Sequence, residues 1–409
     1  MPAIRGNTVE QKWISIAFIN LLIVASLGVI MRYKIAYYLP FIEQENFLHA
    51  HSNFAFSGWV SQVLMALMWA FLYKYLYADS LKKYKWLLIA NLTSAYGMLG
   101  SFILAGYGII SILFATLSIL VSWSFAVIFW IDLNKIKVKI ISVYWFKAAL
   151  LFSIFSSFGA FFLSYMMLSK IQHPNWFLAS NYYFLHFQYN GWFFFGCMGL
   201  LNEQLKGSLS LSLQRIVFWL FALSCIPAYF LSALWLPVPA WIYILMVAAA
   251  IAQLLGWIFI LMAILKNKAV VFGDASGQTK LLFILPAIAL SIKLLLQVGS
   301  TIPSLSNLAF GFRPVVIGYL HLMFLGVISL FLIGFCKMNQ FISPLRAGNT
   351  GIMIFVAGII INEILLMIQG ISYMNYVNVP YINQLLLGAA ICMFCGVLLL
   401  TLGLNRKKS

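Results

Sequence analysis

The chain has 409 residues, of which 64% are hydrophobic and 8% are charged. Soluble domains are roughly half apolar and a quarter charged, so this composition excludes a soluble globular protein and predicts an all-α integral membrane protein. The net charge of +17 does not indicate nucleic-acid binding, because the lysines and arginines fall in short loops between apolar segments, as the positive-inside rule predicts for a membrane protein.

Apolar segments of membrane-spanning length follow one another along the whole chain. The first is followed by no small-residue cleavage site, so no cleavable signal peptide is expected. The loops are alternately rich and poor in lysine and arginine, which places both termini in the cytoplasm. We therefore predict one transmembrane domain over residues 1–409, a bundle of about twelve helices in the cell inner (cytoplasmic) membrane. The predicted spans are residues 12–31, 48–76, 86–105, 108–131, 143–169, 178–202, 213–233, 240–265, 281–299, 314–336, 350–372 and 383–404.

Three of the five histidines lie near the outer ends of the second, sixth and tenth predicted spans: His51, His186 and His321. At ~1.5 Å of rise per residue, all three fall in the outer third of the membrane. An imidazole in the membrane needs an iron, a metal or a hydrogen-bond acceptor, so three of them at one depth predict a haem or metal site within the bundle. The alternative is that each ring is hydrogen-bonded within the protein. His49 is interpreted as a capping or surface residue, and His173, in a loop before Pro174, as a surface residue.

The stretches around these histidines resemble a known family. They are His51-Ser52-Asn53, His186 to Gly191 (HFQYNG) and His321 to Gly326 (HLMFLG). In the second, sixth and tenth of twelve spans, they resemble the large subunit (subunit I) of the haem–copper oxidase superfamily and, within it, the nitric-oxide reductases. The stretch His49-Ala50-His51 is also similar to the opening of the NnrS-type haem–copper membrane proteins. This resemblance implies that His51 and His321 are the axial ligands of one low-spin haem b, and that the protein carries electrons in a respiratory chain.

The chain departs from this family at the catalytic metal. The family's high-spin haem ligand falls at Tyr319, which is alternatively an ordinary interfacial tyrosine. His186 has no histidine partner from the seventh span, and imidazole metal sites use three or more ligands. A second haem and a catalytic copper or iron are therefore not expected, and an oxidoreductase activity on oxygen or nitric oxide is left open. Arg313, just before the tenth span, is expected to neutralise a haem propionate or, alternatively, to contact lipid headgroups.

Two ionisable residues, Lys293 and Glu363, lie inside the ninth and eleventh predicted spans, where such groups are functional candidates. They could form a buried pair, line a proton path or serve ion transport. The alternative functions are a cofactor-free secondary transporter, or a structural or assembly subunit that has kept the fold without cofactors. The expected partners are membrane lipid, a haem or cytochrome partner subunit and a small diatomic gas.

Overall fold

The structure is a computed structural model that describes residues 8–205, 207, 209–305, 312–342 and 344–404. These residues are mostly helical, and they contain no strand beyond one isolated bridge between Pro344 and Leu404. Ten helical segments of the described chain are long and apolar enough to cross a membrane, and the bent pair Leu211–Cys225 and Pro227–Ala233 makes an eleventh if it is one span. The protein is therefore a multi-pass α-helical membrane protein. The predicted count of twelve spans stays a prediction.

The chain divides into two compact units, and the first comprises Met1–Phe125 and Leu332–Ser409. Its helices α5 and α15 cross the division between the units. The single transmembrane domain over residues 1–409 stays a prediction. In chain order, the helical elements are α1 (Thr8–Ala36), α2 (Gln44–Phe54), η1 (Ala55–Ser61), α3 (Gln62–Leu72), η2 (Ala78–Leu81), α4 (Lys83–Ala105), α5 (Ile109–Leu133), α15 (Leu330–Met338), α16 (Arg346–Met374) and α17 (Ile382–Leu402).

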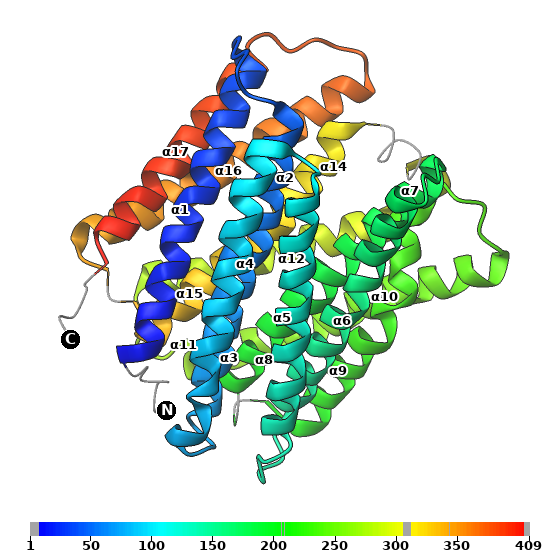
Figure 1. Cartoon of the computed structure of the whole chain (residues 1–409). Helices are drawn as coiled ribbons and strands as arrows, with labels where there is room; N and C mark the ends of the chain where they lie inside the picture. Colours follow the sequence, from blue (N-terminus) through cyan, green and yellow to red (C-terminus); the bar gives the residue numbers. More distant parts are fainter. Residues whose placement is uncertain (1–7, 206, 208, 306–311, 343, 405–409) are drawn as a thin grey trace. The chain divides into compact units, whose positions relative to one another are not determined.

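Two features of packing define the first unit. All residues of α3 are buried, and α1 and α4 pack against it. Helices α16 and α17 approach to backbone contact, since a Cβ on Gly351 would lie 2.5 Å from the nitrogen of Leu400 and a Cβ on Gly396 would lie 2.4 Å from the nitrogen of Phe355. Small residues permit such an approach between membrane helices. Helix α1 packs along α17, and Figure 1 shows α1, α16 and α17 side by side.

The second unit comprises Ala126–Phe331. Its helix α6 packs against the continuous helical run of α7, η3 and α8, while α10 packs against α9 and α12. In chain order, the helical elements are α6 (Ile141–Leu168), α7 (Pro174–His186), η3 (Phe187–Phe193), α8 (Phe194–Gln204), α9 (Leu211–Cys225), η4 (Pro227–Ala233), α10 (Ala240–Lys266), α11 (Lys268–Phe272), α12 (Gly277–Gly299), α14 (Arg313–His321) and η5 (Leu322–Ser329).

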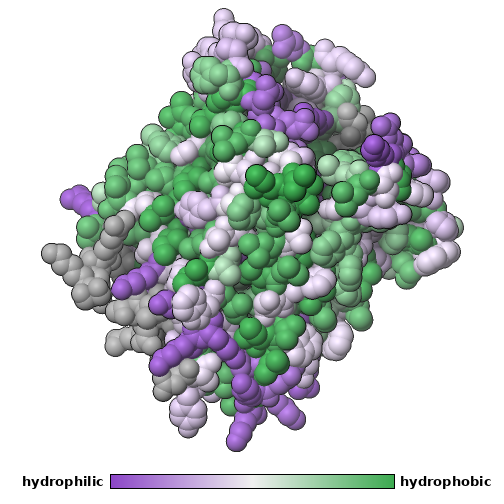
Figure 2. Space-filling view, in the orientation of Figure 1, coloured by the Kyte–Doolittle hydropathy of each residue, from purple (hydrophilic) through white to green (hydrophobic). Residues whose placement is uncertain are grey.

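Apolar side chains cover much of the face seen in Figure 2. Large ones such as Leu104 and Ile109 of the first unit are 86% and 79% exposed. Exposed apolar surface of this extent suits contact with the hydrocarbon chains of a bilayer. Membrane lipid is accordingly a partner of the protein.

Candidate functional site

Each of the three predicted site histidines lies at or near a junction between an α-helix and a π-helix. His186 and His321 are the last residues of α7 and α14, and the π-helices η3 and η5 begin at the next residue, while the π-helix η1 begins four residues after His51. The histidines are evenly spaced, with 135 residues from 51 to 186 and 135 from 186 to 321. Since π-helices are rare and concentrate at functional sites, this threefold local repeat marks the three segments as site candidates.

His51, in α2 of the first unit, faces α1. Its Nδ1 lies 3.1 Å from the carbonyl oxygen of Val24, and its Cε1 would lie 3.6 Å from a Cβ built on Gly28. Because a carbonyl oxygen only accepts hydrogen bonds, Nδ1 carries the proton and the lone pair of the neutral ring falls on Nε2. Proteins commonly orient metal-binding histidines by such a bond from the other ring nitrogen. The residue is half-buried.

His321, in the second unit, is oriented in the same way by its own helix. Its Nδ1 lies 2.8 Å from the carbonyl oxygen of Ile317, one turn back, so this ring also carries its proton on Nδ1 and its lone pair on Nε2. The residue is half-buried, and none of the residues of α14 is fully buried. The chemistry of the donor set therefore suits an iron ligand at both His51 and His321.

Polar side chains of neighbouring helices support η1, the π-helix that follows His51. Asn20 of α1 donates to the carbonyl of Gly58 at 2.6 Å, and Asn91 of α4 donates to the carbonyl of Ser57 at 3.0 Å. Asn91 also donates to Gln62 Oε1 at 2.7 Å. A π-helix departs from the regular i to i−4 bonding pattern, and backbone groups in the membrane must find partners within the protein. Both asparagines are fully buried, so they fix η1 from two sides.

The other two histidines have local roles. His49 lies 3.7 Å from the carboxylate of Glu45, one turn earlier, and its ring packs edge-on against Tyr107 at 4.5 Å between centroids. His173 caps the N-terminus of α7, because its Nδ1 accepts from the backbone nitrogen of Trp176 at 3.4 Å.

His186 has a different environment from His51 and His321. Its Nε2 donates to the carbonyl oxygen of Cys225 at 2.8 Å, and its Nδ1 accepts from the side-chain amide of Asn190 at 3.1 Å. The thiol of Cys225 lies 3.8 Å from the backbone oxygen of Asn190, which closes a cycle of three hydrogen bonds. The side chain is buried, so both nitrogens of this predicted metal ligand are bonded within the protein.

The Cys225 carbonyl accepts this bond because α9 ends there. Pro227 has no backbone N–H, the helix axis bends by 46° between α9 and η4, and the nitrogen of Tyr229 donates to Ile226 instead of Cys225. His186 supplies the donor that the Cys225 carbonyl would otherwise lack at a break inside apolar surroundings. Pro227 thus interrupts the seventh predicted span, whereas Pro286 lies inside α12, which continues through it.

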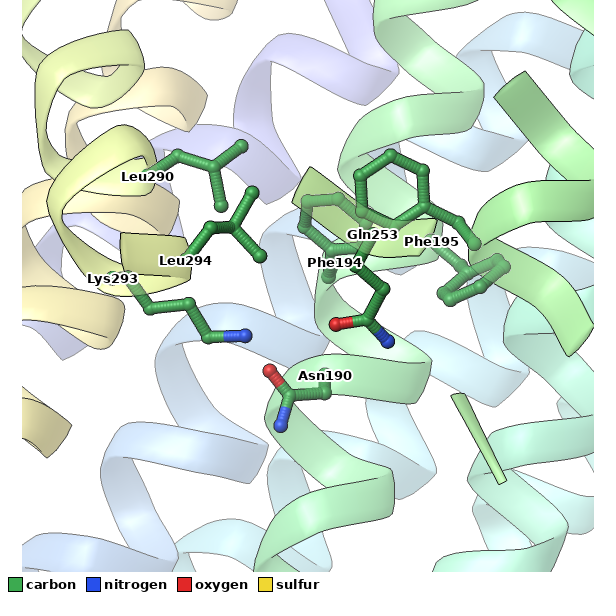
Figure 3. Close-up of a pocket in the computed structure, with 8 residues that line it drawn as sticks. Asn190, Phe194, Phe195, Gln253, Leu290, Lys293 and Leu294 are labelled. Carbon is green, nitrogen blue, oxygen red and sulfur yellow. The ribbon is translucent and has the colours of Figure 1, made fainter. Parts of the chain in front are cut away.

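A cavity of about 10 Å³ lies beside this cycle in the second unit. Figure 3 shows the amine of Lys293 and the side-chain oxygens of Asn190 and Gln253 pointing toward one another across it. The Lys293 amine donates to Gln297 Oε1 at 2.5 Å, and Gln297 Nε2 donates to Gln253 Oε1 at 2.8 Å. The remaining walls of the cavity are apolar: Phe194, Phe195, Phe221, Leu290 and Leu294.

The other predicted site residues occupy separate positions. Tyr319 packs against Tyr189 of η3, with ring centroids 6.5 Å apart, so the segments of His186 and His321 are neighbours within the second unit. Arg313 is exposed at the first residue of α14. Glu363, in α16 of the first unit, is half-buried and accepts from the amide of Asn362 at 3.1 Å. Lys293 and Glu363 therefore each have an amide partner in their own unit.

Within the described ranges, no three histidine, cysteine, aspartate or glutamate side chains are grouped so that they could hold a metal ion. The chain matches no family model, and it has no match among curated proteins. The geometry around the histidines and around Lys293 is thus the basis for assigning a function.

Proposed function

We propose that the protein binds one haem b through His51 and His321 and transfers electrons within the membrane. The observation that most directly supports this is that each ring donates a hydrogen bond from Nδ1 to a backbone carbonyl. The acceptor is Val24 for His51 and Ile317 for His321. This bond fixes in each ring the tautomer that an iron ligand requires. That both rings serve the same iron follows from the resemblance to the haem–copper oxidases.

The role of each residue follows from the chemistry of a six-coordinate iron. Two neutral imidazoles fill both axial positions, which favours electron transfer over binding of a small ligand. The carbonyls of Val24 and Ile317 hold the imidazoles in their orientation. Arg313 lies eight residues before His321, about 12 Å along the helix, and its exposed guanidinium is proposed to pair with a haem propionate. A haem or cytochrome partner subunit would supply the electrons. The protein would lie in the cell inner membrane with both termini in the cytoplasm.

The test is a reduced-minus-oxidised visible spectrum of the purified full chain produced with haem supplied, together with pyridine haemochrome quantitation. We expect one haem b per chain, with loss of the low-spin spectrum in both His51→Ala and His321→Ala. His49→Ala is the matched control, because this histidine contacts Glu45 and Tyr107 instead, and it should retain the wild-type spectrum.

Three outcomes would contradict the proposal. Absence of haem in a folded wild-type protein would favour the alternative transporter or assembly subunit. A haem that persists unchanged in both alanine variants would show that other residues ligate it. Carbon monoxide binding to the reduced wild type would indicate an open axial position, and Tyr319→Phe would then test whether this tyrosine is a ligand.

A further inference from the structure

Lys293 is a buried cation whose described partner is an amide. Its side chain is 3% exposed, and its amine donates to Gln297. The acidic residues of the second unit, Asp132, Glu203 and Asp274, lie at or beyond helix ends. Asp274 precedes α12, whereas Lys293 lies 16 residues after the first residue of α12, about 24 Å along its axis. An ammonium in apolar surroundings is costly unless other groups solvate it.

Three amide oxygens surround the amine of Lys293, and one of them is bonded to it. Gln297 accepts directly, and the oxygens of Gln253 and Asn190 face the amine across the cavity. The orientation of both amides is fixed by their other bonds, because Gln253 Oε1 accepts from Gln297 and the Asn190 nitrogen donates to His186. The cavity volume of about 10 Å³ is at the lower limit for one water molecule, which needs two to four polar partners. Inward-facing oxygens favour a donor such as an ammonium or a water, and disfavour an anion.

We propose that Lys293 is a buried proton-binding site, in which the side-chain oxygens of Gln297, Gln253 and Asn190 and one water molecule solvate the protonated amine. This proposal is independent of haem binding. The same site accommodates the neutral amine, because an uncharged lysine makes fewer demands on its partners. Lys293 therefore gains and loses a proton without unfolding the bundle.

Along α12, polar groups continue from Lys293 toward the C-terminal end of the helix. Gln297 lies one turn beyond Lys293, and its backbone oxygen accepts from Ser300 at 2.8 Å near the end of the helix. Next to it, Tyr243 of α10 donates to the carbonyl of Thr301 at 2.7 Å. The other walls of the cavity are the phenylalanine and leucine side chains already named. The proton therefore exchanges through the C-terminal end of α12.

The charge of Lys293 also sets the direction of a hydrogen-bond chain. With the amine protonated, the Asn190 oxygen faces it and the Asn190 nitrogen donates to His186, which donates in turn to the Cys225 carbonyl at the break of α9. The titratable groups nearest the cavity are His186, Cys225, Tyr189 and Tyr319, and Glu203, the carboxylate on a described element that lines it, lies in the last turn of α8. The protonation state of Lys293 is thereby linked to the broken span.

The experiment measures the midpoint temperature of unfolding, Tm, of the full chain in nanodiscs from pH 5.5 to 9.5. The variants are Lys293→Met and Lys293→Gln, with Lys147→Met as the control, since Lys147 donates to Asn134 at a helix end of the same unit. Loss of the proton relieves the cost of a buried charge. We therefore expect the Tm of the wild type to rise with pH relative to the Tm of both Lys293 variants. The difference in Tm between the wild type and Lys147→Met should stay constant.

A second readout is infrared difference spectroscopy between pH 6 and pH 9. A change in the side-chain amide carbonyl bands in the wild type, absent in Lys293→Gln, would support proton exchange at this site. A Tm gap that is independent of pH, together with the same amide bands in wild type and variant, would overturn the proposal. Haem content plays no part in either readout, so the two proposals fail independently.

Discussion

His321 and His186 occupy corresponding positions at the ends of α14 and α7, yet their surroundings differ. The residue four positions after His186 is Asn190, whose amide reaches the imidazole Nδ1, whereas the residue four positions after His321 is Leu325, which cannot donate. His321 therefore uses Nδ1 as a donor to a backbone carbonyl, and His186 uses it as an acceptor. In His186, the Asn190 amide and the Cys225 carbonyl together place the proton on Nε2.

This comparison teaches that equal spacing along the chain does not imply equal chemistry. In the first unit, His51 is followed four residues later by Ala55 and agrees with His321. The histidines with an apolar residue at this position donate from Nδ1 to a backbone carbonyl. The histidine with an asparagine there stabilises the break between α9 and η4.

The largest effect is expected from His186→Ala. The Cys225 carbonyl and the Asn190 amide would lose their partner in a buried site, and such orphaned groups together with the lost packing cost about 3 kcal/mol. The free energy of unfolding in mixed micelles should fall by this amount, while haem content stays at the wild-type value. Haem loss at unchanged stability would instead indicate that His186 is a haem ligand, and the proposed difference in role between His186 and His321 would be wrong.

A smaller effect is expected from Asn190→Leu, which places a leucine four residues after His186, as Leu325 stands after His321. The Nδ1 of His186 would lose its donor, at a cost of about 1 to 2 kcal/mol. Nitrogen NMR of labelled histidine should show the shift of the His186 Nδ1 resonance that accompanies loss of a hydrogen bond. Leu325→Ala is the matched control, because it alters the corresponding position after His321 without adding or removing a polar group. An unchanged His186 resonance would contradict the assigned bond.

Sequence reasoning predicted the class of protein and much of the helix positions. The span predicted at 86–105 corresponds to α4 (Lys83–Ala105) and the one at 108–131 to α5 (Ile109–Leu133), because long apolar runs between charged loops mark membrane helices plainly. The π-helices were not predicted. A segment that is apolar on every side shows no periodicity, so a shift from 3.6 residues per turn leaves no pattern in it.

The candidate site was predicted less completely than the helices. The residues His51, His186, His321 and Lys293 were singled out, since polar groups are rare in the spans. Gln253 was also expected to hydrogen-bond across helices, but the pairing of these residues with Cys225 and Gln297 was not predicted, because only the tertiary structure brings the separate turns and helices near. Two signals were present in the sequence, however. They are the even spacing of 135 residues between the histidines and the asparagine four residues after His186.

Asn91→Ala probes the support of η1 after His51. The Ser57 carbonyl and Gln62 would each lose a donor, and we expect a cost of about 1 kcal/mol after relaxation. If η1 positions His51, haem affinity in a competition assay should fall severalfold without reaching the total loss expected for His51→Ala. The control is Asn375→Ala, since this exposed asparagine bonds only the last turn of its own helix. Wild-type haem affinity in Asn91→Ala would show that η1 does not position His51 for haem binding.

The smallest effect is expected from Cys225→Ser, which changes only the weakest bond of the cycle. A thiol is a poor donor, and its sulfur lies 3.8 Å from the Asn190 backbone oxygen. A hydroxyl is a stronger donor than a thiol, but its shorter C–O bond and smaller oxygen pack less well. The gain in hydrogen bonding and the loss in packing nearly offset each other, so the free energy of unfolding should change by less than about 1 kcal/mol. Cys336→Ser, a buried cysteine outside the cycle, is the control for the burial of a hydroxyl. A loss in Cys225→Ser as large as that of His186→Ala would mean that the thiol, and not the imidazole, stabilises the broken span.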